Sequence, residues 1–192
     1  MILVVGLGNP GPRYLKTRHN AGFLVVDGLH EQSRCTPWEL RFLGQFAAGS
    51  FGGVRLGLLK PQTFMNRSGE SVRMALGSCA VSIDELLVVH DDLDLPLGRL
   101  RLKQGGGTGG HRGLASITEH LNTPDYVRLR FGIGRPPADF EGDIASYVLE
   151  DFAATERPDL PLWVAKSVEA VVLVARDGLA AAMNQVNRRN TA

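Results

Sequence analysis

Short apolar segments alternate with amphipathic ones along most of the chain, and this alternation limits the possible folds more than any other feature. Apolar runs and alternating residues predict strands at 2–6, 44–51, 54–59, 86–90, 99–103 and 126–133. Apolar residues at helical spacing predict helices at 21–33, 68–79, 111–121 and 160–189. A chain that alternates strands and helices in this way is typical of an α/β domain, with helices packed against a sheet.

Length and composition fit a single domain that needs no cross-links. With 192 residues, 44% of them hydrophobic and 21% charged, the chain can bury a core of its own. No basic leader precedes the first strand, and no apolar run approaches the roughly 18 residues that cross a membrane. The two cysteines, Cys35 and Cys79, belong to no C-x-x-C pair. We therefore expect a cytoplasmic protein of one domain, residues 1–192, with no membrane partner.

The first strand leads into Gly6–Gly11, a G-x-G-x-x-G sequence that is typical of dinucleotide-binding proteins. In such a site a helix begins within the glycines, and its backbone N–H groups bind the pyrophosphate. Here Pro10 and Pro12 lack those N–H groups, and the next helix is expected only after Asn20, its predicted N-cap. A nucleotide-dependent oxidoreductase is therefore a weak alternative. The glycines fit better with a tight turn that brings Asn9 close to a ligand.

Two segments that follow predicted strands carry side chains suited to acid–base chemistry. His19 lies in the loop after the first strand, and Asp91 follows His90 at the end of a later one. Ligands of α/β sheets bind at the carboxyl ends of strands, where a carboxylate could hold an imidazole in one tautomer. Consecutive strand residues point to opposite faces, so His90 and Asp91 are not expected to act together. A metal site is a minor alternative, because no fixed spacing completes a set of ligands.

Asparagines in two loops could take part in the same chemistry. Asn9 follows the first strand, and Asn66 precedes the helix expected at 68–79. Their amides could bind an acyl group while a histidine activates water. Asn66 could instead cap the helix that follows it, which is the more common role of such a residue.

Basic residues are concentrated in one part of a nearly neutral chain. The net charge is +1, yet residues 99–135 carry seven basic and two acidic side chains, or +5, which leaves −4 for the rest. Such a patch could bind phosphates, or it could be an unevenly charged surface. The same segment contains Gly105–Gly110, which suits either a mobile lid or a backbone nest for phosphate but lacks the G-K-[ST] end of a P-loop.

Taken together and in order, GLGNPGPRY, TRHNAGF, KPQTFMNRSG, VVHDDLDLPLG, GGGTGGHRGL and RLRFGIG resemble the bacterial peptidyl-tRNA hydrolase family. The resemblance runs from residue 2 to about residue 135 and continues more weakly in the closing helix. It implies a single globular α/β domain, in which helices flank a twisted mixed β-sheet. The implied activity is hydrolysis of the ester between peptide and tRNA in peptidyl-tRNA released from ribosomes. A monomer without metal or cofactor would perform it with a His-activated water and no covalent intermediate.

The resemblance also implies roles for individual residues. His19 would be the catalytic base and Asp91 its partner, while Lys103 and Arg130 would bind tRNA phosphates. The implied substrate-binding residues are Asn9, Tyr14, Met65, Asn66, His111 and Arg112. A helix N-terminus near His19 disfavours its cationic form, whereas Asp91 favours it, and we expect the two effects to offset each other.

Arg112 departs from the family pattern, which usually has asparagine after the histidine of this loop. Arginine could bind a phosphate or a 3′-terminal group through its planar donors, or it could weaken binding. A non-catalytic RNA-binding protein on the same fold is therefore the alternative function. The presence of His19, Asp91, Asn9 and Asn66 argues against it.

Overall fold

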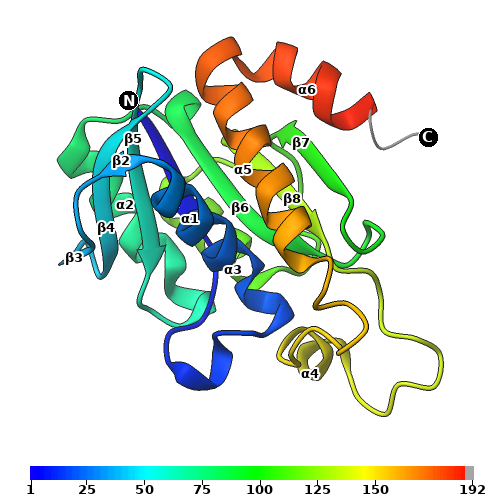
Figure 1. The fold of residues 1–192 in the computed structure, drawn as a ribbon. Coiled ribbons are helices and arrows are strands. Elements are labelled where there is room, and N and C mark those ends of the chain that lie inside the picture. The colour runs from blue at the N-terminus through cyan, green and yellow to red at the C-terminus, as the bar shows by residue number, and fades with distance from the viewer. Residues whose placement is uncertain (189–192) are drawn as a thin grey trace.

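Strand β1 lies near the centre of a mixed sheet in the computed structural model, which describes residues 1–188 (Figure 1). The strands are β1 (Ile2–Gly6), β2 (Arg34–Cys35), β3 (Glu39–Arg41), β4 (Gly44–Phe51), β5 (Val54–Pro61), β6 (Leu86–Asp92), β7 (Leu100–Gln104) and β8 (Val127–Gly132). Their order is β2-β4-β5-β1-β6-β8-β7, and β3 pairs with β4. Neighbours from β5 to β8 are parallel, whereas the β4–β5 hairpin and the edge strand β7 are antiparallel. The mixed sheet implied by the family resemblance is confirmed.

Helices cover both faces of this sheet. They are α1 (Ala21–Gln32), α2 (Ser68–Cys79), α3 (Arg112–Leu121), α4 (Ile144–Val148), α5 (Leu160–Asp177) and α6 (Leu179–Arg188). In Figure 1, α1 and α5 lie in front of the sheet, and α2 and α3 lie behind it. Successive side chains of β1 point to opposite faces of the sheet. Val4 packs in the core beneath α1, while Leu3 and Val5 pack in the core beneath α2 and α3. The central strands are therefore buried on both sides, which explains their apolar runs.

The single helix expected at 160–189 is wrong, because the structure has two helices there. Gly178 ends α5 with a φ of 83°, which glycine adopts readily. Helix α6 then packs along β7, where the side chain of Asn187 accepts from the backbone N–H of Leu102 at 2.9 Å and donates to its carbonyl at 3.0 Å. The last expected position, Arg189, lies outside the described residues.

Two glycines, Gly6 at the end of β1 and Gly22 in α1, allow α1 to pack directly on the strand ends. Gly6 lies against the backbone carbonyl of Gly22 in α1, and Gly22 lies equally close to the backbone of Val89 in β6. A side chain at either glycine would overlap these backbone atoms. Because α1 begins only at Ala21, no α-helix starts within the glycine motif, and only a three-residue 3₁₀-helix, Pro12–Tyr14 with Gly11 as its N-cap, follows it directly. The motif therefore serves helix–strand packing, and the fold gives no support to a dinucleotide site.

The functional residues lie where parallel strands end. The carboxyl ends of β1, β5, β6 and β8 meet at one edge of the sheet, and the loops after β1 and β5 converge there on the end of β6. In residues 1–188 no helix is both long and apolar enough to span a bilayer. Ligands of α/β sheets bind at such an edge, outside the carboxyl ends of the strands.

Candidate active site

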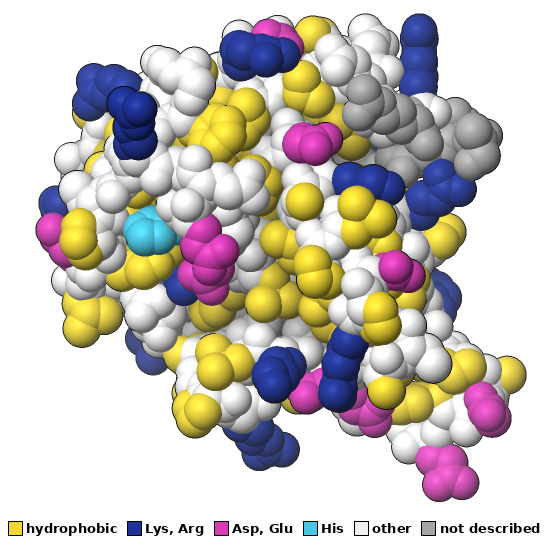
Figure 2. All heavy atoms as spheres, in the orientation of Figure 1, with side chains coloured by type: hydrophobic (Ala, Val, Ile, Leu, Met, Phe, Trp, Pro, Cys, Tyr) yellow, Lys and Arg dark blue, Asp and Glu magenta, His cyan; other side chains and the backbone are white. Residues whose placement is uncertain are grey.

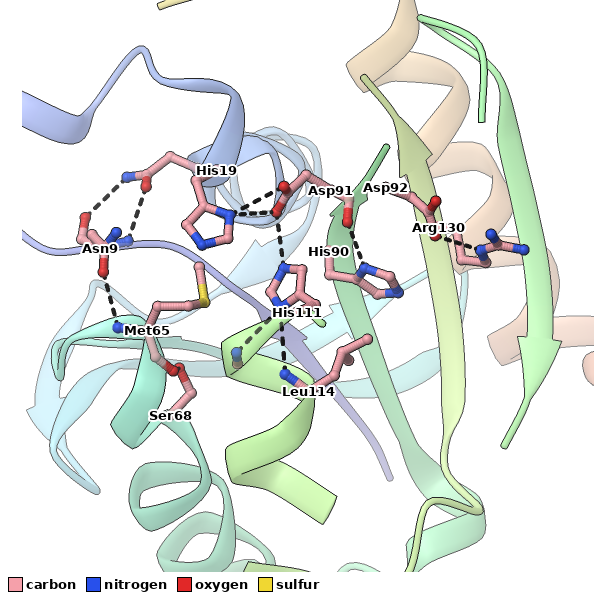
Figure 3. Close-up of polar contacts among 12 residues, drawn as sticks. Asn9, His19, Met65, Ser68, His90, Asp91, Asp92, His111, Leu114 and Arg130 are labelled. Carbon is pink, nitrogen blue, oxygen red and sulfur yellow. Dashed lines mark hydrogen bonds and ion pairs between the residues drawn. The ribbon is translucent and has the colours of Figure 1, made fainter. Parts of the chain in front are cut away.

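Asp91 lies at the centre of the site, with its carboxylate between two imidazoles (Figure 3). Its Oδ1 is 2.9 Å from Nδ1 of His19 and 3.0 Å from Nε2 of His111. Asp91 comes from β6, His19 from the short 3₁₀-helix η2 (Arg18–Asn20), and His111 from the N-cap of α3. Only 3% of the Asp91 side chain is exposed. The fold thus brings His19 and Asp91 together, and it adds a second histidine that the sequence did not link to this carboxylate.

Hydrogen bonds fix which nitrogen of each imidazole carries the proton. Nδ1 of His111 accepts the backbone N–H groups of Gly113 and Leu114, at 3.1 and 3.4 Å. In the neutral ring the proton is therefore on Nε2, which donates to Asp91. Nδ1 of His19 donates to the same carboxylate, so Nε2 of neutral His19 carries no proton. Since His19 lines the cavity described below, this nitrogen is available as a base.

Burial and charge act in opposite directions on the pKa values of this group. Burial by itself would raise the pKa of Asp91, but the charges and hydrogen bonds of His19 and His111 hold it well below its usual range. Burial would likewise lower the pKa of His19, yet Asp91 outweighs it and raises that pKa above 6.5. Arg112 acts against this rise. The two effects expected to offset each other therefore do not, because Asp91 stabilises the cationic form of His19 and its pKa is raised.

His90 takes no part in the contact with the carboxylate. Its Nδ1 donates to the backbone carbonyl of Asp91 at 2.7 Å, while its ring meets the ring of His111 edge-on with centroids 5.2 Å apart. Burial and the neighbouring His111 lower the pKa of His90 to about 3, so the ring is neutral. The expectation that His90 and Asp91 do not act together agrees with this geometry.

Asn9 is held rigidly beside His19. Its backbone N–H donates to the side chain of Asn20 at 2.9 Å, and the Asn20 amide donates back to the Asn9 carbonyl at 3.0 Å. The side-chain oxygen of Asn9 accepts the backbone N–H of Met65 at 2.9 Å. This contact orients the amide, so that its NH₂ group remains free to donate into the cavity. Asn20 was predicted to cap α1, but its side chain forms this pair with Asn9 instead.

The site opens into a cavity of about 820 Å³. One wall is apolar and comes from α4 and the residue after it, through Ile144, Val148 and Leu149. Phe64, 60% exposed, adds a further apolar side chain to the lining. The sequence did not indicate the α4 wall, because the segment from 134 to 157 lacks a long periodic pattern.

Most of the expected site residues line this cavity, and one does not. Those that line it are Asn9, His19, Met65, Asn66, Asp91, Lys103, His111, Arg112 and Arg130. Tyr14 lies in the 3₁₀-helix η1 (Pro12–Tyr14), half-buried and outside the lining. Asn66 is exposed and provides no side-chain cap for α2, which leaves its amide available to the cavity.

The three central residues also form the one group of potential metal ligands found in residues 1–188. Their ligand atoms lie within 4.8 Å of one another. Metal binding through Nε2 of His111 would require a lone pair there, but Nδ1 of the same ring already uses its lone pair on two backbone N–H groups. The donor set therefore favours the hydrogen-bonded arrangement over a metal site.

Cations line the opposite end of the cavity. Lys103 of β7 pairs in register with Arg128 of β8, and Arg101 pairs with Arg130. These side chains share the sheet face that α2 and α3 cover elsewhere, whereas the face with α1 and α5 carries scattered charges of both signs (Figure 2). Burial and the neighbouring guanidinium groups lower the pKa of Lys103. A bound phosphate would relieve this repulsion.

Arg128, which the sequence did not single out, holds the glycine loop in place. It is almost fully buried and donates to the carbonyls of Gly106 and Gly107 at 2.8 and 2.7 Å. Its guanidinium also stacks on Tyr126, 4.7 Å from the ring centroid. The first half of the loop is thus anchored beside Lys103.

Comparisons with known proteins show the family of the chain. A family model described as peptidyl-tRNA hydrolase matches residues 3–192. The chain belongs to the peptidyl-tRNA hydrolase family. A peptidyl-tRNA hydrolase of Sorangium cellulosum is 49% identical over 189 residues, 98% of this chain and 85% of that protein. One from Anaeromyxobacter dehalogenans is 48% identical over 192 residues, 100% of this chain and 99% of that protein.

Solved structures of the family have the same fold. The crystal structure of peptidyl-tRNA hydrolase from Acinetobacter baumannii has a TM-score of 0.89 and 38% identity, and the match covers 97% of this chain and 94% of that one. The predicted family, fold class and enzyme class are confirmed. The relatives are named as hydrolases, so a non-catalytic RNA-binding protein finds no support among them.

Proposed function

We propose that this member of the peptidyl-tRNA hydrolase family hydrolyses the ester between peptide and tRNA in peptidyl-tRNA released from ribosomes. The observation that carries the proposal is the free Nε2 of His19, beside a cavity that is apolar at one wall and basic at the other end. The substrate has matching parts, because an acyl group lies on one side of the ester and a phosphate backbone on the other. Cleavage returns the tRNA to translation in the cytoplasm, and we expect a monomer to suffice.

His19 acts as the general base in this mechanism. Nε2 takes a proton from a water, whose oxygen attacks the ester carbonyl, while Asp91 stabilises the imidazolium through Nδ1. The same proton then passes to the departing 3′-oxygen of the tRNA, which leaves a free hydroxyl; the second proton of the water stays on the new peptide carboxyl group and is lost to solvent, which gives the carboxylate. An ester is already an activated acyl group, so no covalent intermediate is needed. General base catalysis of this kind contributes roughly 10²- to 10⁴-fold.

Amides and cations orient the substrate around this base. The free NH₂ group of Asn9 donates to the acyl part, and Asn66 donates from the facing loop beside Met65. Lys103 and Arg130 bind phosphates of the tRNA. Two further substrate contacts, by Arg112 at the cavity and by Tyr14 outside it, remain predictions.

The test is the release of N-acetyl-aminoacyl groups from tRNA by the wild type and by His19→Ala. We expect rapid cleavage by the wild type and a loss of about 10²- to 10⁴-fold in the variant. His120→Ala is the matched control, because His120 lies on α3 outside the cavity, and it should cleave normally. Salt-sensitive tRNA binding by the wild type without cleavage would instead indicate an RNA-binding protein.

A further inference from the structure

Arg18, the residue before His19, is a buried cation surrounded by a distant part of the chain. Only 6% of its side chain is exposed. Its guanidinium donates to the backbone carbonyl of Asp151 and to the carboxylate of Glu156, both at 2.9 Å. It also stacks on the ring of Tyr147 in α4, 4.4 Å from the centroid. A buried charge is tolerated only when it is paired in this way, so these contacts lock the side chain in one position.

The backbone around Arg18 is joined to the same distant segment. Thr17 forms an isolated antiparallel bridge with Asp151, and the N–H of Arg18 donates to the carbonyl of Glu150 at 3.0 Å. The 3₁₀-helix η2, which carries His19, is therefore attached to residues 150–152 by both main chain and side chain. Asp91 contacts His19 from the other side, through the ring.

The segment that surrounds Arg18 also forms the apolar wall of the cavity. Tyr147 lies within α4, whose Ile144 and Val148 line the cavity, and Glu156 follows a few residues later. Glu156 accepts the backbone N–H of Ala153 at 2.6 Å as well as the guanidinium, so it closes the turn after α4 around Arg18. The Arg18 side chain thus contacts the segment that carries the apolar wall, while its backbone belongs to η2, which carries His19.

We propose that Arg18 is a positioning residue that fixes His19 relative to Asp91 and ties it to the α4 wall, a role that rests on the proposed function of His19 as the base. Lysine cannot replace it, because an ammonium group lacks the planar fork that reaches Asp151 and Glu156 while lying flat on Tyr147. Loss of the fork lets η2 and α4 separate. His19 then moves away from Asp91, and the wall that receives the acyl group moves as well.

The experiment compares wild type and Arg18→Lys by turnover of N-acetyl-aminoacyl-tRNA and by NMR titration of the histidine rings. We expect kcat to fall about tenfold or more and KM to rise, because base and wall lose their support together. The pKa of His19 should fall, since Asp91 raises it; the other titratable and charged groups that face its ring, His111 and Arg112, are not altered by the substitution. His30, bonded to the carbonyl of Thr36 far from Arg18, is the internal control, and its ring signals should not differ between the wild type and the variant.

Two further variants keep the outcome decisive. Glu156→Gln weakens the same ion pair from the other side without altering η2, and it should lower the His19 pKa and kcat in the same direction by a smaller factor. Arg157→Lys is the control, because Arg157 is exposed and bonds only to its own segment, and we expect it to leave both quantities unchanged. Reduced thermal stability of Arg18→Lys and Glu156→Gln with unchanged His19 pKa, kcat and KM would overturn the proposal. A wild type that does not cleave would refute the proposed function, and the titration would still decide the position of His19.

Discussion

The two ends of the cavity are built in opposite ways. At the end with His19, which we call the rigid end, Asp91, His111 and Asn9 are held by hydrogen bonds to fixed partners. At the other end, which we call the basic end, Lys103 is half-buried, and the anion that acts on it, Asp92, is already paired with Arg130. Ester chemistry needs fixed geometry, whereas phosphate binding needs mainly charge. Substitutions at the two ends should therefore fail in different ways.

The largest effect is expected from Asp91→Asn. The amide can present its NH₂ group to Nδ1 of His19, which moves the ring proton to Nε2 and removes the base. We expect kcat to fall about 10²- to 10⁴-fold with little change in KM, measured under single-turnover conditions. A loss of less than tenfold, with the fold intact by circular dichroism, would contradict the proposed link between Asp91 and His19.

His111→Asn separates two roles of one side chain in the rigid end. Asparagine is a good N-cap, so it should still accept the N–H groups at the start of α3, but it is too short to reach Asp91. We expect a kcat loss of about tenfold, in keeping with one lost hydrogen bond to a charged group, and a free energy of unfolding near that of the wild type.

His111→Ala is the matched comparison for this prediction. It loses the cap as well, so it should be destabilised by a further ~1 kcal/mol in urea unfolding at a similar kcat. Equal stability of the two variants would show that the cap contributes little. Normal kcat in both would show that the bond to Asp91 does not affect the base.

The contrast between the two ends also explains what the sequence could predict. The central strands are predictable because burial on both faces makes them apolar runs, and His19 and Asp91 follow from their places after strands. The basic end is visible as a charge excess in one segment. Charge and periodicity are properties of short stretches, so they survive in a single sequence.

The details of the rigid end depend on contacts between distant residues. Nothing in the sequence around Asn20 indicates that it pairs with Asn9 rather than with its own helix. The bond from His111 to Asp91 likewise arises only when the loop after β7 folds back over β6. Strands β2 and β3 are too short and too exposed to give a pattern. Such features are set by tertiary packing, which local patterns do not record.

A smaller effect is expected at the basic end from Lys103→Gln. We expect KM for peptidyl-tRNA to rise about tenfold at low salt with kcat nearly unchanged, because one phosphate contact is lost. The slope of log KM against log salt should fall by about one. Lys166→Gln, an exposed change on α5, is the charge-matched control and should leave the slope unaltered. A fall in kcat without a change in slope would place Lys103 with the rigid end instead.

The smallest effect is expected where the two ends meet, at Arg112. Its charge lowers the pKa of His19, so Arg112→Asn should raise that pKa further above 6.5. The base works only when neutral, and kcat/KM therefore rises with pH through this pKa. The acidic limb of the profile should move to higher pH, with a rate loss of about two- to threefold on the limb and none on the plateau. Because Arg112 is exposed, high salt should reduce the rise in the His19 pKa that Arg112→Asn causes. Arg112→Lys keeps the positive charge and should leave the acidic limb where it is in the wild type. A limb that moves to lower pH would mean that Arg112 acts through contacts with the substrate rather than through the charge of His19.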